Sequence, residues 1–169
     1  MLTTTTDIQD FLAHRRIALV GVSRNPRDFS RILFREMCTR GYDMVPVNPV
    51  AIEMENRRCF ARVQDIEPPA EAALIMTAPQ QTENVVRDCL QAGILDVWMH
   101  RGGGQGAVSE EAVKFCRGNG MRLVKGYCPY MFLASTSLVH RVHRFFTKLV
   151  GSYPADVQSP SFDRPLIRR

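Results

Sequence analysis

The sequence predicts an α/β fold, in which a doubly wound, mostly parallel sheet of five strands carries helices on both faces. Two observations predict it. Short, nearly all-apolar segments alternate with longer segments whose apolar residues recur every three or four positions. The changes between the two kinds fall at glycines, prolines or polar clusters. The 169 residues, 45% of them hydrophobic, suit one domain with a core of its own.

The first elements are a short helix, a buried strand and a second helix. Thr5 or Thr6 can cap the short helix, because a threonine oxygen accepts from the first backbone N–H groups of a helix. The strand covers 16–20 and is almost entirely apolar. The helix at about 30–40 has an apolar face and ends at Gly41.

The second strand is expected at 43–47. Pro46 near its end lacks a backbone N–H, so it favours an edge position or an early stop. A loop follows at 48–57, and 58–61 form a short extra strand.

The third strand, at 72–76, is apolar on both sides, as a strand buried on two faces should be. A helix at about 80–92 ends at Gly93 and leads into a fourth strand at 95–99. These units continue the alternation expected of parallel strands joined by crossover helices.

Ser109 caps the next helix, and two glutamates in its first turn suit the helix dipole. This helix ends near Gly118 or Gly120, before a fifth strand at 122–124. The pattern then changes. An extra C-terminal helix with an apolar stripe is expected at 137–150, followed by an extended tail, so that 1–134 form the domain and 135–169 form no independent domain.

Charge and cysteine content limit the class of protein. The net charge of +5 and the pI of about 9.2 suit a polyanionic small ligand, but no block of like charges indicates a nucleic-acid partner. The five cysteines contain no CxxC pair, which favours a reduced, cytoplasmic protein. The N-terminus lacks the features of a secretory signal, and no apolar run reaches the roughly 18 residues that span a membrane.

The strand at 16–20 enters a turn at Gly21 and then a helix near Ser30. Unpaired N–H groups and the dipole at a helix start favour an anion, so this crossover predicts a phosphate-bearing ligand. Ligands of such sheets lie beyond the carboxyl ends of the strands. The segments that follow the strands are Gly21–Pro26, Asn48–Pro49, Thr77–Pro79, His100–Gly104 and Gly126–Cys128.

The turn lacks the G-x-G-x-x-G pattern of dinucleotide-binding folds, and no carboxylate follows Val47 to hold a ribose diol. NAD is therefore disfavoured. Arg24 and Arg27 beside the turn favour a ligand with more phosphate than NAD carries, because a guanidinium pairs with phosphate through two hydrogen bonds.

Several motifs together resemble a known family. They are Val20–Pro26 followed by Ser30, Gly41-Tyr42, Pro46–Pro49, Val97–Met99 before a glycine loop, Ser109–Ala112, and Met121–Cys128. This combination resembles the small stand-alone CoA-binding proteins, which are similar to the nucleotide-binding domain of the succinyl-CoA synthetase alpha subunit. The resemblance covers roughly residues 8 to 133.

The resemblance implies a Rossmann-like fold that binds CoA or acyl-CoA. Gly21, Ser23, Asn25 and Ser30 would hold the phosphates, Asn48 and Pro49 would border the adenosine 3′-phosphate, and Met76 to Pro79 would line the path after the third strand. The expected binding residues are Gly21, Val22, Ser23, Arg24, Asn25, Ser30, Asn48, Pro49, Met76, Thr77, Ala78, Pro79 and His100. Many family members have arginine where this chain has Thr77 and glutamine where it has His100.

The expected function is CoA or acyl-CoA binding by a non-enzymatic carrier, sensor or accessory module. Two alternatives stay open: an NAD(H)-responsive regulatory module, and an acyl-CoA enzyme that uses His100 or Cys128. We expect no metal site, since His140 and His143 lack companion ligands. The helix at 137–150 is the candidate contact of a homodimer.

Overall fold

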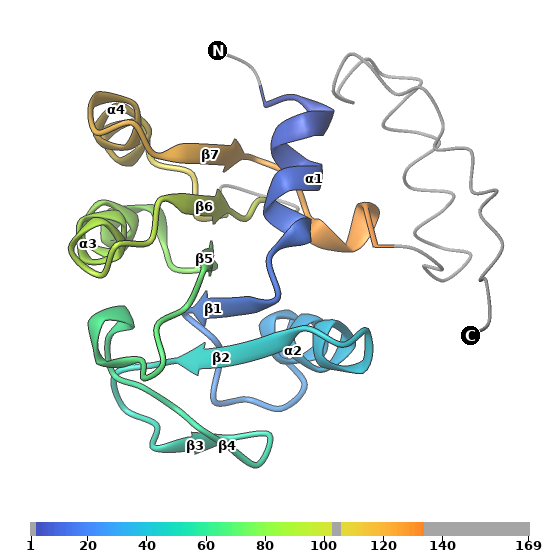
Figure 1. The fold of residues 1–169 in the computed structure, drawn as a ribbon. Helices are drawn as coiled ribbons and strands as arrows, with labels where there is room; N and C mark the ends of the chain where they lie inside the picture. The colour runs from blue at the N-terminus through green and yellow to red at the C-terminus, as the bar shows by residue number, and fades with distance from the viewer. Residues whose placement is uncertain (1–2, 103–105, 134–169) are drawn as a thin grey trace, which may run out of the picture.

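Five parallel strands form the centre of the computed structural model, which describes residues 3–102 and 106–133 (Figure 1). They are β1 (Arg16–Val20), β2 (Asp43–Val47), β5 (Ala72–Ile75), β6 (Asp96–Met99) and β7 (Arg122–Lys125). Their order in the sheet is β2-β1-β5-β6-β7. The chain first builds outward to β2 and then returns past β1 to β5, so the switch point of the topology lies between β1 and β5. The predicted α/β, Rossmann-like fold is confirmed.

Within the described residues, four α-helices cover the sheet, two on each face (Figure 1). They are α1 (Thr5–Ala13), α2 (Phe29–Thr39), α3 (Pro79–Gln91) and α4 (Glu110–Gly118), with two short 3-10 turns, η1 (Val63–Asp65) and η2 (Pro129–Met131). Helices α1 and α2 share one buried cluster with the sheet, and α3 and α4 share the other. Each crossover therefore lies on a defined face, as expected of a doubly wound sheet.

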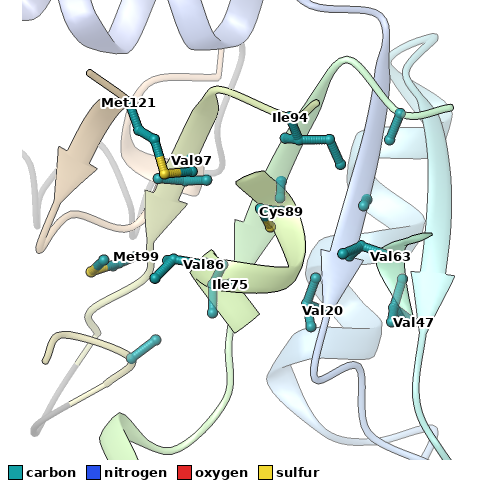
Figure 2. Close-up of a cluster of buried hydrophobic side chains, with 14 of the residues drawn as sticks. Val20, Val47, Val63, Ile75, Val86, Cys89, Ile94, Val97, Met99 and Met121 are labelled. Atoms are coloured by element: carbon teal, nitrogen blue, oxygen red, sulfur yellow. The ribbon is translucent and has the colours of Figure 1, made fainter. Parts of the chain in front are cut away.

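The core alternates along each strand. In β1, Ala18 and Val20 face α3 and α4, whereas Ile17 and Leu19 face α1 and α2. Figure 2 shows the α3 and α4 side, where Val86 and Cys89 of α3 pack toward strand residues such as Ile75. This two-sided burial explains the near-continuous apolar strands in the sequence.

Strand β2 lies at the edge of the sheet, as Pro46 predicted. The Pro46 carbonyl accepts from the N–H of Phe60 at 3.0 Å, and the N–H of Asn48 donates to the Phe60 carbonyl at 2.9 Å. Proline is tolerated here because no neighbouring strand requires its missing N–H. Phe60 also covers part of an edge that would otherwise expose unpaired backbone groups.

The region after β2 differs from the expected loop and single strand. Residues Glu53–Met54 (β3) and Arg57–Arg58 (β4) form a small antiparallel hairpin. Its turn residues Glu55 and Asn56 have φ of 51° and 57°. Asparagine tolerates this positive φ. The hairpin leaves little pattern in the sequence, because its turn has no glycine and its strands are only two residues long.

The first helix is capped by Thr4 rather than by Thr5 or Thr6. The Thr4 hydroxyl accepts from the Asp7 N–H, and the Asp7 carboxylate accepts from the Thr4 N–H, which completes a capping box. Ser109 caps α4 as expected. The helix expected at 137–150 lies outside the described residues. Among helices that are described, none is long and apolar enough to cross a membrane.

Candidate functional site

The turn after β1 is built on Gly21 and packs directly against the segment after β5. Gly21 has φ +87°, and a Cβ added to it would lie 2.9 Å from both the backbone N and the Cγ2 of Thr77. Its N–H donates to the Val47 carbonyl at 3.0 Å. Only glycine combines this conformation with such a close approach. The position therefore fixes the spacing of two loops at the switch point.

The loop that follows is held by its own side chains. The Ser30 hydroxyl accepts from the Ser23 N–H at 2.9 Å and donates to Asp28 Oδ1 at 2.6 Å. Ser23 Oγ accepts from the Asn25 N–H at 3.1 Å, and Asn25 Oδ1 accepts from the Arg27 N–H at 3.0 Å. Three of the predicted phosphate ligands thus shape the loop through their side chains.

The start of α2 is only partly available to an anion, which corrects the expectation of bare amides. Asp28 caps the helix, and its carboxylate accepts from the Ser30 N–H at 2.9 Å. Among the described residues, no group accepts from the backbone N–H of Val22, Arg24 or Phe29. These three amides, rather than the whole helix end, are the donors that remain for an anion.

Two arginines of α2 hold the outside of this loop. Arg31 donates to the Ser23 carbonyl at 3.3 Å, and Arg35 donates to the Pro26 carbonyl at 3.0 Å. Both also pair with Glu55 of the hairpin turn, with donor–acceptor distances of 2.5–2.8 Å. Burial of Glu55 opposes its ionisation, but these hydrogen bonds outweigh it and keep its pKa below the ordinary value.

A cleft of about 410 Å³ opens on the α3 side of the switch point. It brings together four predicted residues, Gly21, Asn48, Pro49 and Thr77. The rest of its wall consists of Val20, Val47, Val50, Ala61, Arg62, Val63, Gln81, Asn84, Val85 and Asp88. The cleft thus combines apolar walls with polar groups from α3, which is typical of a small-molecule site.

Asn48 joins the loop after β2 to the loop after β1. Its Nδ2 donates to the Val22 carbonyl at 2.8 Å, and its Oδ1 accepts from the Val50 N–H at 3.0 Å. Because both its nitrogen and its oxygen are hydrogen-bonded, the Asn48 side chain has a fixed position in the wall of the cleft. Val50 beside it is 70% exposed, which leaves an apolar surface at the mouth.

The other predicted residues are spread around this cleft. Arg24 and Asn25 are exposed, whereas Val22 is buried in the core beneath α1 and α2. Met76 packs partly against the same core, and Pro79 is the first residue of α3. Among the segment 76–79, only Thr77 lines the cleft, and its Oγ1 lies 3.2 Å from the buried Thr82 hydroxyl.

His100 leaves β6 on the α2 side and is 8% exposed. Its ring lies 5.6 Å from the ring of Phe29, centroid to centroid. Burial lowers the pKa of His100 to about 4, so the imidazole is neutral at physiological pH. A neutral imidazole still has one donor and one acceptor nitrogen, but it offers no positive charge to a phosphate.

Cys128, the candidate nucleophile, follows β7 as expected. Burial raises the pKa of its thiol to about 11, even though hydrogen bonds with the backbone of Tyr130 and Met131 lower it. The thiolate that attacks an acyl carbon is therefore scarce at neutral pH. No group of three or more His, Cys, Asp or Glu within the described ranges is placed to hold a metal ion.

Sequence reasoning missed the contribution of α3 to the cleft. Gln81, Asn84, Val85 and Asp88 are spaced by three, four and seven positions, so they share one face of the helix. That spacing is visible in the sequence, but the rule that ligands lie beyond the strand ends points only to residues directly after each strand. Arg62 was missed because the segment around it has no periodic pattern.

Comparisons with known proteins give a consistent assignment. The profile described as "CoA binding domain" matches residues 15–134. A curated relative, the "Uncharacterized protein YneT" of Bacillus subtilis (strain 168), is 26% identical over 114 residues, which cover 68% of this chain and 82% of the relative.

Two solved structures illustrate the similarity. A hypothetical protein from Pyrococcus horikoshii OT3 has a TM-score of 0.69 at 30% identity, with 75% of this chain and 87% of that chain covered. The apo "dinucleotide forming Acetyl-coenzyme A synthetase 1" of Ca. Korarchaeum cryptofilum has a TM-score of 0.56 at 26% identity. The match covers 66% of this chain but only 26% of that synthetase.

Proposed function

The chain belongs to the CoA binding domain family, and from this premise we propose that it binds coenzyme A or an acyl-CoA at the carboxyl end of its sheet. The observation that carries the proposal is the cleft at the switch point, directly beside a glycine turn with unpartnered amides. A nucleotide with a diphosphate needs both features, an apolar cleft for the base and oriented N–H donors for the phosphates.

In this proposal the diphosphate lies against the amides of Val22, Arg24 and Phe29. The side chains of Arg24 and Arg27, both exposed at this loop, supply positive charge. The adenosine occupies the cleft beside Asn48 and Pro49. The arm that carries the sulfur passes Thr77. Met76, Ala78 and Pro79 shape the segment around Thr77.

Arg62 is the candidate partner of the adenosine 3′-phosphate. It lines the cleft, and its guanidinium pairs with Asp88 at 3.3 Å while remaining 58% exposed. An exposed pair of this kind contributes little to stability and is easily exchanged for a phosphate.

The geometry supports CoA over NAD. A ribose diol requires a carboxylate after β2, where the cleft instead has Asn48. Glu55, the nearest acid of the hairpin, is engaged by Arg31 and Arg35. Asp88 faces the cleft from α3, but its carboxylate already accepts from Gln64 Nε2 at 2.7 Å.

We assign the protein a binding role, as carrier, sensor or accessory module, rather than catalysis by itself. His100 is a weak base, and Cys128 holds its proton, so neither supplies an activated nucleophile. The proposal includes a cytoplasmic location, a binding domain over 1–134, and a homodimer formed through the helix expected at 137–150. Light scattering of the whole chain and of a chain ending at Ala134 tests the dimer.

Isothermal titration of the full chain with CoA and with NADH tests the proposal. We expect CoA to bind at least about tenfold more tightly, because only CoA brings the additional phosphate. Equal affinities would favour the NAD(H)-responsive module, and the absence of binding at millimolar CoA would contradict the proposal itself.

A further inference from the structure

His100 has a rigid backbone at the edge of the sheet where the ligand is proposed to lie. Its N–H donates to the Ile75 carbonyl at 3.0 Å, and its carbonyl accepts from the Ala107 N–H at 2.7 Å. The alternation along β6 places Val97 and Met99 on the α3 side and Trp98 on the α2 side. The imidazole therefore lies on the α2 side, one strand away from the segment that contains Thr77.

The imidazole has an unsatisfied nitrogen. Nε2 of His100 is buried and has no hydrogen-bond partner among the residues that the structure describes. Buried polar atoms in native proteins are nearly always paired, so a particular exception requires an explanation such as a ligand or an ordered water. The backbone hydrogen bonds of His100 fix the point from which its side chain leaves the strand, and the unpaired nitrogen is a candidate partner for an incoming group.

The surroundings of Nε2 select the kind of group. The ring of Phe29 lies 5.6 Å from that of His100 and 6.3 Å from that of Tyr130, centroid to centroid. Burial alone lowers the pKa of His100 to about 4, and no charged residue contributes to that shift. The neighbouring aromatic rings and the burial of Nε2 suit a neutral polar group, whereas a carboxylate buried beside them would lose its hydration.

The position relative to the phosphate turn also fits. Neighbouring strands lie about 4.8 Å apart, so β6 lies about 10 Å from β1, two strands along the sheet. The pantetheine arm of CoA spans such a distance between its phosphates and its sulfur. The diphosphate at Gly21 and the sulfur near His100 would then belong to one extended molecule.

We propose that Nε2 of His100 hydrogen-bonds the uncharged sulfur-bearing end of the ligand, so that the site accepts a thiol or a neutral acyl thioester and disfavours an acyl group that ends in a carboxylate. The proposal rests on the function proposed above. His100 acts here as a specificity-determining residue, and no covalent step is assigned to it.

The test compares ligands that share the phosphate end. Adenosine 3′,5′-bisphosphate lacks the arm, while acetyl-CoA and succinyl-CoA differ in whether the acyl group carries a charge. For the full chain we expect acetyl-CoA to bind about tenfold more tightly than succinyl-CoA. In His100→Leu, acetyl-CoA should bind about tenfold more weakly, since one hydrogen bond is lost, and adenosine 3′,5′-bisphosphate should bind as in the unchanged protein.

Two controls separate this role from a structural one. His100→Gln retains a hydrogen-bonding side chain and should recover part of the acetyl-CoA affinity. His14→Leu, at the opposite end of the sheet, should change the affinity for neither ligand. The ¹⁵N resonances of the His100 ring should move with acetyl-CoA and stay in place with adenosine 3′,5′-bisphosphate.

The outcomes distinguish the two proposals. If acetyl-CoA binds while the His100 resonances stay in place, the inference is wrong and CoA binding stands. A parallel loss of both ligands in His100→Leu also overturns it, since the effect of His100 would then not be confined to the sulfur-bearing end. If neither ligand binds the unchanged protein, CoA binding fails and the inference fails with it.

Discussion

The two ends of the sheet treat their polar groups differently. At the amino end, carboxylates are engaged by side chains or by backbone N–H groups. Asp96 pairs with Arg122 and His14, Asp43 pairs with Arg16 and Arg57, and Glu71 accepts from the N–H groups of Arg15 and Arg16. At the carboxyl end, three loop amides and the Nε2 of His100 have no acceptor or donor among the described residues.

This difference indicates which end is built for stability and which for binding. A carboxylate with two partners has little to offer a ligand, because the ligand would have to break more than one existing interaction. Unsatisfied groups cost stability and are retained where a ligand completes them. In an open α/β sheet the carboxyl end is also where the topology leaves a crevice. The predictions below therefore separate binding from stability, one end at a time.

The largest effect is expected from Gly21→Ala. The new Cβ would lie 2.9 Å from the Thr77 backbone at φ +87°, so the two loops of the site must separate. We expect CoA binding to weaken by more than about 100-fold and unfolding free energy to fall by about 3 kcal/mol, from strain and overpacking together.

Gly41→Ala is the matched control for that change. Gly41 has φ +89°, but a Cβ there meets nothing within 4 Å. It should cost about 1 kcal/mol in denaturant unfolding and leave titration with CoA unchanged. Equal effects of the two variants on binding would show that the approach to Thr77 is irrelevant.

The pH dependence of stability should separate the ends as well. The pKa of His100 is lowered from an unfolded value near 6.5 to about 4, so the unfolded chain binds the proton first. The contribution of His100 to the free energy of unfolding is complete above pH 6.5. It is lost as the pH falls toward 4, and the total loss is about 3 kcal/mol. Urea unfolding of His100→Gln should lack this loss.

The carboxylates of the amino end respond at lower pH. Hydrogen bonds from the backbone of Arg15 and Arg16 lower the pKa of Glu71. For Asp43, burial opposes ionisation, but Arg16 and Arg57 outweigh it and the pKa is lowered. Their stabilisation is present above the unfolded pKa values and is lost below about pH 4.5, so it should persist in His100→Gln. If the unchanged protein and His100→Gln lost stability over the same pH range, that result would contradict the division between the ends.

A change at the amino end should affect stability alone. Asp96 is 5% exposed and binds Arg122 through both of its carboxylate oxygens, with His14 Nε2 at 3.1 Å. Asp96→Asn leaves the Arg122 guanidinium without this carboxylate, but Arg122 is largely solvated, so we expect about 2 kcal/mol of destabilisation by urea unfolding.

Glu83→Gln provides the comparison for Asp96→Asn, since Glu83 forms an exposed pair with Arg87 along α3. It should change stability by less than about 0.5 kcal/mol. Both variants should bind CoA within about twofold of the unchanged protein. Weakened CoA binding in Asp96→Asn would mean that the two ends are coupled.

The sequence predicted the sheet well because burial on two faces leaves an unmistakable pattern. The apolar runs located the five strands, and Pro46 located the edge. The hairpin around Glu55 was missed, since strands of two residues carry no periodicity and their turn lacks glycine. Local pattern is informative only where an element is long enough to repeat it.

The candidate cleft was predictable in position but not in detail. Topology alone places ligands after the strands, and Gly21, Asn48 and Thr77, which the sequence predicts as binding residues, do line this cleft. The capping of α2 by Asp28 and the burial of His100 depend on three-dimensional packing that sequence spacing does not reveal. The same holds for the helix α3 side of the cleft, because Asn84 reaches the cleft only when α3 packs back against β5.

The smallest effect is expected from Arg31→Lys, which keeps the charge and removes the planar fork. Arg31 bridges Glu55 and the Ser23 carbonyl, and a lysine ammonium cannot span both in the same geometry. We expect CoA to bind about fivefold more weakly, near 1 kcal/mol, because the loop amides are less well oriented before the ligand arrives. Arg87→Lys, in the exposed pair of α3, should leave CoA titration unchanged. If Arg31→Lys binds CoA as well as the unchanged protein, positive charge rather than loop geometry determines binding at this end of the sheet.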